Sequence, residues 1–443
     1  MDELKSIFRD KSQQLKEKIK AMLKEHGNMK IDEVRLEQAF GGMRGIQSMI
    51  WETSLLDAQE GIKFRGFSIP QIQELLPKAP GGHEPLPEGI FWLMLTGEIP
   101  TDAQVQWLSD EWERRAVIPR AMTLVLDALP EEVHPMTQFS IAINALQADS
   151  IFARRYEEGM PKTEYWDATY EDAMNLIARI PFAAAHIYRR IFKGNKHIAA
   201  DRSLDWAANY SHMLGFEGQE CHEMMRLYQT IHADHEGGNA SAHTAHLVGS
   251  TLSDVYLSYA AAMNALAGPL HGLANQEVIK WIFDMVAALG TRKPTSEQIA
   301  AYVKETLNKG QVIPGYGHAV LRQPDPRFYA QKRFSERYLA EDDIIQIVWR
   351  LFEIVPPILQ SLGKVSNPWP NVDAHSGAML VHYGLTEYNY YTVLFGVSRS
   401  LGVMAAQCWA RALGFPLERP KSLTSDWVFD FVQHNNDLNN VNS

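Results

Sequence analysis

The amino-acid sequence predicts an all-α fold, and three observations support that class. Apolar residues recur at spacings of three and four along most of the chain, which is the periodicity of amphipathic helices. No segment alternates polar and apolar residues over the length of a strand, and no glycine-rich phosphate loop follows a strand-like run. With 443 residues, of which 46% are hydrophobic, the chain is long enough to bury a large helical core.

Helices are expected in order along the chain. The first covers residues 4–23, has acidic residues in its first turn and stops at Gly27. Apolar positions then recur at helical spacing in residues 88–95, 121–129, 166–180, 252–266 and 342–362. We expect the third of these helices to end against Pro181, and the last to kink or break at Pro356 and Pro357. Loops are expected at residues 77–82, 291–294, 314–317 and 367–370.

The longest apolar stretch, residues 391–415, is predicted to be a buried helix. Arg399 and Arg411 interrupt it, which argues against a membrane span. Small residues at helical spacing within 240–250 and 260–267 predict two helices that approach each other closely. Such a pair suits either a dense core or a subunit interface, and the sequence leaves both open.

Composition excludes several function classes. The chain has 53 acidic and 42 basic residues, a formal net charge of −11, which argues against general binding to nucleic acid or to a membrane surface. A local cationic pocket for an anionic ligand remains open. The two cysteines, Cys221 and Cys408, fit a reducing compartment. The acidic N-terminus resembles neither a transit peptide nor a signal peptide, so a bacterial cytoplasmic protein is expected, with a processed mitochondrial matrix protein as the alternative.

Histidines are the first chemical signal. Five of the 16 histidines fall within forty residues: His232, His235, His243, His246 and His271. A metal site is not favoured, because the zinc-binding His-Glu-x-x-His pattern is absent. His243 and His246 are interpreted as core histidines whose ring nitrogens bond to backbone groups. His235 differs, since Gly237 and Gly238 beside it allow the backbone to approach a ligand.

Three other segments carry candidate functional side chains. His271 follows Gly268-Pro269 in a turn that either aims its ring at a substrate carbonyl or is simply structural. His318 follows two glycines, whose backbone N–H groups can face a ligand, and cations come after it at Arg322 and Arg327; a plain surface loop is the alternative. Asp373 follows a proline-rich entry and is either a functional carboxylate or a helix N-cap.

Arg399 requires an anionic partner. It lies in an apolar helical context, where an unpaired guanidinium is costly to desolvate. The partner is either a protein carboxylate or a substrate carboxylate, and both suit the planar guanidinium. Arg419 lies in the segment 416–420, which begins and ends with a proline, and is a further rigidly held cation. Together with the histidines and Asp373, these arginines suggest a pocket for a small dianion.

The segments around these residues resemble the citrate synthase family, in its dimeric type. The resemblance runs from about Arg44 to about Ser422, and the order and separation of the motifs make it specific. It implies an all-α homodimer whose subunits each have two domains. The large domain would comprise residues 1–271 and 380–443, and the small domain, residues 272–379, would close over the substrates.

The resemblance also implies a reaction and a role for each site residue. Members condense acetyl-CoA with oxaloacetate and hydrolyse the resulting citryl-CoA, without a metal or prosthetic group. By resemblance, Asp373 would remove a methyl proton, His271 would stabilise the enol through the thioester oxygen, and His318 would polarise the ketone. The residues matching the oxaloacetate-binding set are His235, Arg327, Arg399 and Arg419, the last from the partner subunit.

The coenzyme A contacts that the resemblance implies are spread along the chain. They are Arg44, the segment Pro314, Gly315, Tyr316 and Gly317, then Lys364, and Lys162 from the partner subunit. Lys162 stands where the family pattern has Arg, so it keeps the charge but loses the forked geometry of a guanidinium.

Three alternatives remain beside this hypothesis. A 2-methylcitrate synthase would keep every catalytic residue and accept propionyl-CoA. A metal-dependent hydrolase would be built on residues 232–246. A non-catalytic helical interaction protein would leave the buried arginines unexplained.

Overall fold

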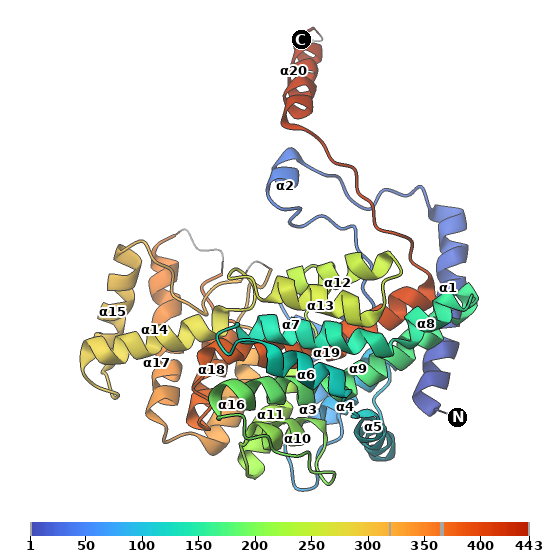
Figure 1. Ribbon diagram of the computed structural model, residues 1–443. Helices are drawn as coiled ribbons and strands as arrows, with labels where there is room; N and C mark the ends of the chain where they lie inside the picture. Colours follow the sequence, from blue (N-terminus) through green and yellow to red (C-terminus); the bar gives the residue numbers. More distant parts are fainter. Residues whose placement is uncertain (1, 319, 364–366, 442–443) are drawn as a thin grey trace.

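The computed structural model describes residues 2–318, 320–363 and 367–441, with side chains up to residue 435 (Figure 1). Most of these residues are helical, so the predicted all-α class is confirmed. The helices are α1 (Glu3–His26), α2 (Leu36–Phe40), α3 (Ile69–Leu75), α4 (Pro87–Thr96), α5 (Asp102–Arg115), α6 (Arg120–Ala128), α7 (Pro135–Leu146), α8 (Ile151–Glu157), α9 (Tyr165–Phe192), α10 (Trp206–Leu214), α11 (Gln219–Ile231), α12 (Ala240–Ser250), α13 (Val255–Leu266), α14 (Ala274–Leu289), α15 (Ser296–Asn308), α16 (Pro326–Tyr338), α17 (Asp343–Ser361), α18 (Asp373–His382), α19 (Tyr391–Leu413) and α20 (Ser425–Val441). Short 3-10 helices are η1 (Gln147–Asp149), η2 (Lys162–Glu164) and η3 (Tyr388–Tyr390).

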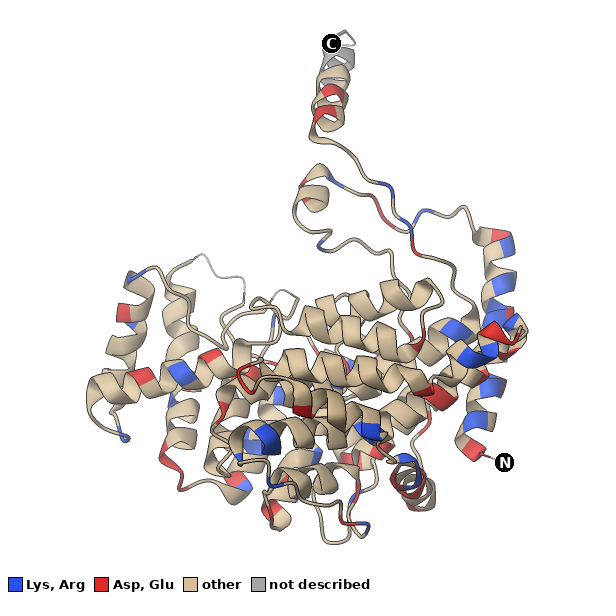
Figure 2. Cartoon of the chain, in the orientation of Figure 1, with Lys and Arg blue, Asp and Glu red and all other residues tan. Residues whose placement is uncertain are grey.

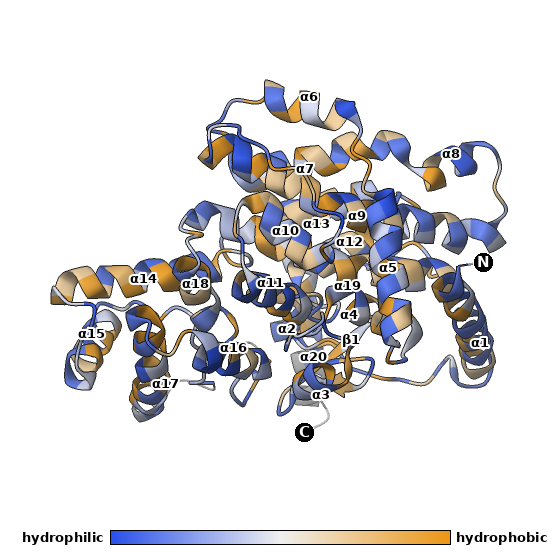
Figure 3. Cartoon of the chain, turned by 90° about the horizontal axis from the view of Figure 1, so that it is seen from below, coloured by the Kyte–Doolittle hydropathy of each residue, from blue (hydrophilic) through white to orange (hydrophobic). Residues whose placement is uncertain are grey.

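The core forms around α19, the helix predicted from the long apolar stretch. It packs against α9, α4, α1, α12, α11 and α13, and nearly all of its side chains are buried. Lys, Arg, Asp and Glu are sparse in these central helices and frequent along α1 (Figure 2), whose hydrophilic residues lie at the edge of the body (Figure 3). Among the described residues, no helix has the length and apolar character needed to cross a membrane. The small-residue helices α12 and α13 pack side by side, as their alanines predicted.

A small antiparallel sheet corrects the expectation of no strands. It consists of β1 (Ser54–Asp57), β2 (Gly61–Phe64) and β3 (Phe67–Ser68), in the order β1-β2-β3. Ser54 pairs with Phe64 and Asp57 with Gly61. Strands of two to four residues are too short to show a period-two pattern, which is why the sequence did not reveal them.

The expected end at Pro181 is wrong, and the break allowed for at Pro356 and Pro357 does not occur. Helix α9 continues through Pro181 to Phe192. A proline has no N–H for the carbonyl four residues earlier, but here the carbonyl of Ile177 accepts a hydrogen bond from the indole Nε1 of Trp206 at 3.0 Å. The freed acceptor is therefore satisfied from α10. Helix α17 likewise runs from Asp343 to Ser361 without a break at its two prolines.

Helices α14 to α18 lie together on one side of the molecule (Figure 1). They pack mainly on one another, through the pairs α14 with α18, α15 with α17, and α16 and α17 with α18. Contacts of α16 with α3 and α11 join them to the rest of the chain. This group spans residues 274–382, which overlaps the predicted small domain of residues 272–379 but extends three residues beyond it. The domain boundaries stay a prediction.

Two segments extend away from the body on the same side (Figure 1): residues 27–50, which include α2, and residues 415–441, which include α20. We call them the N-terminal arm and the C-terminal arm. Their large apolar side chains are exposed, namely Met29, Ile31, Val34, Phe40, Met43, Ile50, Leu417, Leu423, Trp427, Phe429 and Phe431. Apolar surface of this extent on extended segments is typical of a protein–protein interface.

Candidate active site

His271 lies in the turn that connects α13 to α14. Its Nε2 accepts a hydrogen bond from the backbone N–H of Ser241 at 3.2 Å and lies 2.9 Å from the Ser241 hydroxyl. Since Nε2 is an acceptor, the proton of the neutral ring is on Nδ1. Burial, and then the charge of Arg399, lowers the pKa of His271 to about 4. The ring is therefore neutral at pH 7, with an Nδ1–H that can donate to a ligand.

His318 is held in the opposite tautomer. Its Nδ1 accepts hydrogen bonds from the backbone N–H groups of Val320 at 3.0 Å and Leu321 at 3.1 Å. The proton of the neutral ring is therefore on Nε2. Burial, followed by the charge of Arg327, lowers the pKa of His318 to about 4. This histidine too is a neutral donor at pH 7.

The loop before His318 pairs with the segment before Asp373. Gly315 and Gly317 both have positive φ, and a side chain on Gly315 would collide with the backbone of Ala374. The Gly317 N–H donates to the carbonyl of Trp369 at 2.9 Å, and the Asn371 N–H donates to the carbonyl of Gly315 at 2.9 Å. These close contacts join the two segments, so His318 and the start of α18 are held in one unit.

Asp373 is the first residue of α18 and does not cap it, which corrects the N-cap alternative. Val372 occupies the cap position, and the Asp373 N–H donates to the side chain of Asn371 at 3.0 Å. Burial raises the pKa of the Asp373 carboxyl to about 6, against the lowering effect of Arg327 and Arg399. No described side chain donates a hydrogen bond to this carboxylate, so it is free to act on a ligand.

His235 lies between α11 and α12, beside His318. The two ring centroids are 5.5 Å apart, and the planes are inclined at 68°. The Nε2 of His235 is buried and has no hydrogen-bond partner among the described residues. Burial and the charge of Arg327 hold its pKa well below the usual range. The neighbouring Gly237 leaves room for Trp51 and Met49, whose side chains a Cβ at this position would meet. The approach of this backbone to a ligand stays a prediction.

Two buried arginines complete the cluster. Arg327, near the start of α16, pairs with Asp325, with 2.7 Å between Nη2 and Oδ2. Arg399, in the middle of α19, donates from Nε to the carbonyl of His232 at 3.3 Å and from Nη1 to Oδ1 of Asn239 at 3.0 Å. It forms no ion pair with a described carboxylate. Burial lowers the pKa of Arg399 to about 10, against the raising effect of Asp234.

Six of the predicted site residues therefore belong to one cluster: His235, His271, His318, Arg327, Asp373 and Arg399. Of the remaining predicted residues, the segment 314–317 directly precedes His318 and pairs with the segment before Asp373. The others are not part of the cluster. Arg44 and Arg419 are exposed on the N-terminal and C-terminal arms. Lys162 lines a separate cavity of about 600 Å³ near the end of α19. Lys364 falls outside the described residues.

The other histidines of residues 232–246 have structural partners. His243 lies 2.9 Å from Oε1 of Glu418, and His246 lies 3.9 Å from Oε2 of the same carboxylate. They thus meet a side chain, where backbone partners were expected. No three His, Cys, Asp or Glu side chains of the described residues are grouped so that they could hold a metal ion.

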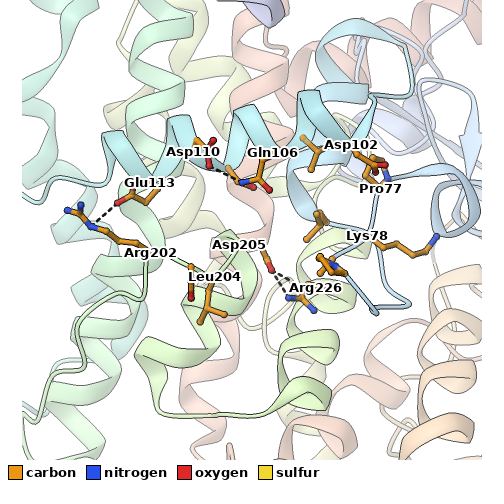
Figure 4. A pocket seen from close by; sticks show the side chains of 16 residues that line it. Pro77, Lys78, Asp102, Gln106, Asp110, Glu113, Arg202, Leu204, Asp205 and Arg226 are labelled. Atoms are coloured by element: carbon orange, nitrogen blue, oxygen red, sulfur yellow. Dashed lines mark hydrogen bonds and ion pairs between the residues drawn. The ribbon is translucent and has the colours of Figure 1, made fainter.

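Another cavity, of about 510 Å³, lies between α5, α10 and α11 (Figure 4). In its wall, Oδ2 of Asp205 lies 2.6 Å from Nη2 of Arg226, and Oε1 of Glu113 lies 3.1 Å from Nε of Arg202. None of the clustered site residues lines this cavity. Both of its arginines are paired with carboxylates of the same lining.

The sequence did not reveal the residues that hold the cluster in place. Ser241 fixes the tautomer of His271, Asn239 and the His232 carbonyl hold Arg399, and Asn371 links the two loops. Most are common polar residues whose role depends on contacts far apart in sequence. Only Asn239 carried a local signal, because asparagine is a common N-cap residue. Its side chain caps α12 by accepting a hydrogen bond from the backbone N–H of Ala242.

Comparisons with known proteins cover nearly the whole chain. The family model "Citrate synthase, C-terminal domain" matches residues 42–421. Citrate synthase 4, mitochondrial, from Arabidopsis thaliana is 55% identical over 426 residues, which is 96% of this chain and 90% of the plant protein. The mitochondrial citrate synthase of Xiphias gladius is 54% identical over 430 residues, 97% of this chain and 92% of the fish protein.

Solved structures share the fold. The citrate synthase of Pyrobaculum aerophilum matches with a TM-score of 0.73 and 26% identity, covering 87% of this chain and 92% of that one. A ternary complex of the Thermoplasma acidophilum citrate synthase with carboxymethyl coenzyme A and oxaloacetate matches with a TM-score of 0.73 at 22% identity. It covers 88% of this chain and 96% of that one. The expectation of a non-catalytic interaction protein is not supported.

Proposed function

The chain belongs to the citrate synthase family, and from that premise we propose that it condenses acetyl-CoA with oxaloacetate and water to give citrate and CoA. The observation that carries the proposal is the pair of neutral histidines in opposite tautomers. One ring nitrogen of His271 accepts from one backbone N–H and one of His318 from two, and no described residue accepts from the opposite N–H of either ring. A carboxyl group with a raised pKa, Asp373, belongs to the same cluster.

Oxaloacetate would be held by cations that lack full partners in the free chain. Arg399 forms no ion pair with a described residue, so a substrate carboxylate would supply its counter-charge. Arg327 would hold the second carboxylate from beside Asp325, and the buried Nε2 of His235 supports a further hydrogen bond. Exclusion of water would strengthen each of these interactions.

His318 would act on the ketone of oxaloacetate. Its free Nε2–H would donate to the ketone oxygen and make the carbon more electrophilic. As the carbon–carbon bond forms, negative charge develops on that oxygen, and a proton from Nε2 would neutralise it. A neutral imidazole is suited to this step because its Nδ1 remains held by two backbone donors.

Asp373 and His271 would generate the nucleophile. The Asp373 carboxylate would remove a proton from the methyl group of acetyl-CoA, and the Nδ1–H of His271 would donate to the thioester oxygen as the enol forms. The raised pKa of Asp373 makes it a stronger base than an ordinary aspartate. The enol carbon then attacks the ketone, and water hydrolyses citryl-CoA. We propose that side chains supply all of this chemistry, with no metal or prosthetic group.

A dimer would complete each site. Arg419 is exposed on the C-terminal arm, and no described hydrogen bond or ion pair joins it to the cluster of its own chain, which supports the proposal that it reaches the oxaloacetate of a second copy. The exposed apolar residues of both arms support the same association. For coenzyme A we propose Arg44, Lys364, the segment 314–317, and Lys162 from the second copy.

We infer a mitochondrial matrix location from the relatives, which are named as mitochondrial proteins. They support the alternative stated from the sequence and give no support to the bacterial cytoplasm. They also favour citrate synthase over 2-methylcitrate synthase.

The proposed reaction is tested by measuring CoA release from the purified protein. Release should require both acetyl-CoA and oxaloacetate and should persist in the presence of a chelator. Faster turnover of propionyl-CoA than of acetyl-CoA would assign the 2-methylcitrate reaction instead. Absence of release with either acyl-CoA would refute the proposed function.

A further inference from the structure

We propose that Asp234 is a positioning residue that fixes the oxaloacetate-binding loop, residues 232–239, against α19; this inference rests on the proposed function. Asp234 directly precedes His235 and is fully buried. Neither the sequence motifs nor the family resemblance gave it a role. Its environment nevertheless differs from that of an ordinary buried aspartate, because two nearby residues, His235 and Arg399, are oxaloacetate-binding candidates.

Four donors converge on the Asp234 carboxylate. Oδ2 accepts hydrogen bonds from the Trp51 indole at 3.0 Å, from the Ser54 hydroxyl at 2.8 Å and from the Thr53 hydroxyl. Oδ1 accepts from the backbone N–H of His235 at 3.0 Å. All four donors are neutral, and they satisfy the buried charge without an ion pair. Three of them belong to the segment that leads into β1, so the small sheet anchors the loop.

Helix α19 packs directly onto the same residue. A Cβ on Gly402 would lie 2.5 Å from Cβ of Asp234 and 2.4 Å from the carbonyl oxygen of Ala233. The Gly402 N–H donates to that carbonyl at 3.1 Å. Arg399 lies about one turn earlier on α19. The contact at Gly402 therefore fixes the position of α19 along the loop, and with it the place where the Arg399 guanidinium meets the loop.

This arrangement lets Asp234 stabilise Arg399 without neutralising it. The carboxylate is the strongest influence that raises the pKa of Arg399 against the lowering effect of burial. Because neutral donors occupy both of its oxygens, the carboxylate forms no ion pair with the guanidinium. Arg399 thus keeps donors for a substrate carboxylate, while the nearby negative charge reduces the cost of burying it.

The test compares Asp234→Asn with a matched control, Asp172→Asn. The asparagine would place an NH₂ group, itself a donor, opposite the three donors that Oδ2 now accepts from. This mismatch should disturb the loop. We expect the KM for oxaloacetate to rise about 10- to 100-fold, the range typical of residues that orient a ligand-binding group. The KM for acetyl-CoA and kcat should change less than about threefold. Thr53→Val removes a single donor with little change of shape and should give a smaller rise in the same KM.

Asp172 in α9 is equally buried, and its carboxylate accepts from the Ser150 hydroxyl at 2.8 Å and from the N–H groups of Ile151 at 2.7 Å and Phe152 at 3.0 Å. Asp172→Asn should lower the Tm and leave the KM for oxaloacetate unchanged. Equal KM changes in both Asn variants, or none in Asp234→Asn, would overturn the inference. If Asp234→Asn does not fold, the KM of Thr53→Val decides. Wild-type protein that neither releases CoA nor binds oxaloacetate would refute the proposed function itself, and this inference with it.

Discussion

At the Asp373 carboxyl, burial and two arginines act in opposite directions, and burial prevails. The pKa rises to about 6 from an ordinary value of 3.8. A base must be ionised to accept a proton, so kcat/KM should fall as the pH decreases through about 6, whereas an ordinary aspartate would stay ionised to about pH 4. A pH–rate profile measured between about pH 5 and 8 checks this predicted fall of kcat/KM. A profile that is flat down to about pH 5 would contradict the assignment.

Arg399 is the residue whose replacement separates binding from folding. We expect Arg399→Leu to weaken oxaloacetate binding by about 2–5 kcal/mol, since the substrate would lose the partner of a desolvated charge. The Tm of the ligand-free protein should not fall, because a buried charge without an ion pair is removed. Isothermal titration calorimetry measures the affinity for oxaloacetate, and thermal unfolding measures the Tm.

Arg411→Leu is the matched control for that experiment. Arg411 lies on the same helix, is largely buried, and its pKa is also lowered by burial to about 10. Its Nη2 donates to the carbonyl of Ser253 at 2.9 Å. Its replacement should leave oxaloacetate affinity unchanged. Equal losses of affinity in both variants would show that Arg399 is structural.

The sequence pointed to the residues of the cluster more readily than to the residues that hold them in place. His271, His318, Asp373 and Arg399 stood out because glycine-flanked histidines and an arginine in an apolar helix are chemically unusual. The tautomers of the histidines were beyond prediction, because they depend on backbone N–H groups of a distant helix and of the following turn. Asp234 gave no signal, since its four donors come largely from residues about 180 positions earlier.

At the scale of elements, the continuity of α9 through Pro181 makes a testable prediction. Trp206→Phe removes the indole that satisfies the Ile177 carbonyl and should cost about 1–3 kcal/mol of unfolding free energy. In a Pro181→Ala background, the new N–H can bond to that carbonyl, so the same substitution should cost less. Denaturant unfolding of the four proteins in this cycle measures the coupling. Equal costs in both backgrounds would show that the indole does not serve the helix.

Helix existence was predictable where periodicity was strong, as in α1, α13 and α19. The expectation at Pro181 failed because a local rule was applied without knowledge of a distant donor, the Trp206 indole. The pairing of residues 314–317 with 369–371 joins segments more than fifty residues apart, and only the structure shows it. That pairing matters for function, because it links His318 to Asp373.

At the scale of the whole molecule, the role proposed for Arg419 predicts sites shared between subunits. We expect Arg419→Ala and Asp373→Ala homodimers both to be inactive. Mixed dimers would contain one site with both substitutions and one intact site, so an equal mixture of refolded chains should recover about a quarter of wild-type activity. Recovery is measured as CoA release after mixing. Failure of the mixture to exceed the separate variants would contradict a site completed by the partner.

The measurement that tests the catalytic roles most directly uses Asp373→Ala with two readouts. CoA release from acetyl-CoA and oxaloacetate should be abolished, because the variant lacks the base that removes the methyl proton. The dissociation constant of oxaloacetate, measured by titration calorimetry, should stay within about threefold of the wild-type value, since Arg327, Arg399 and His235 are unchanged. Residual release near the wild-type rate, or a large loss of oxaloacetate affinity, would show that Asp373 is not the base.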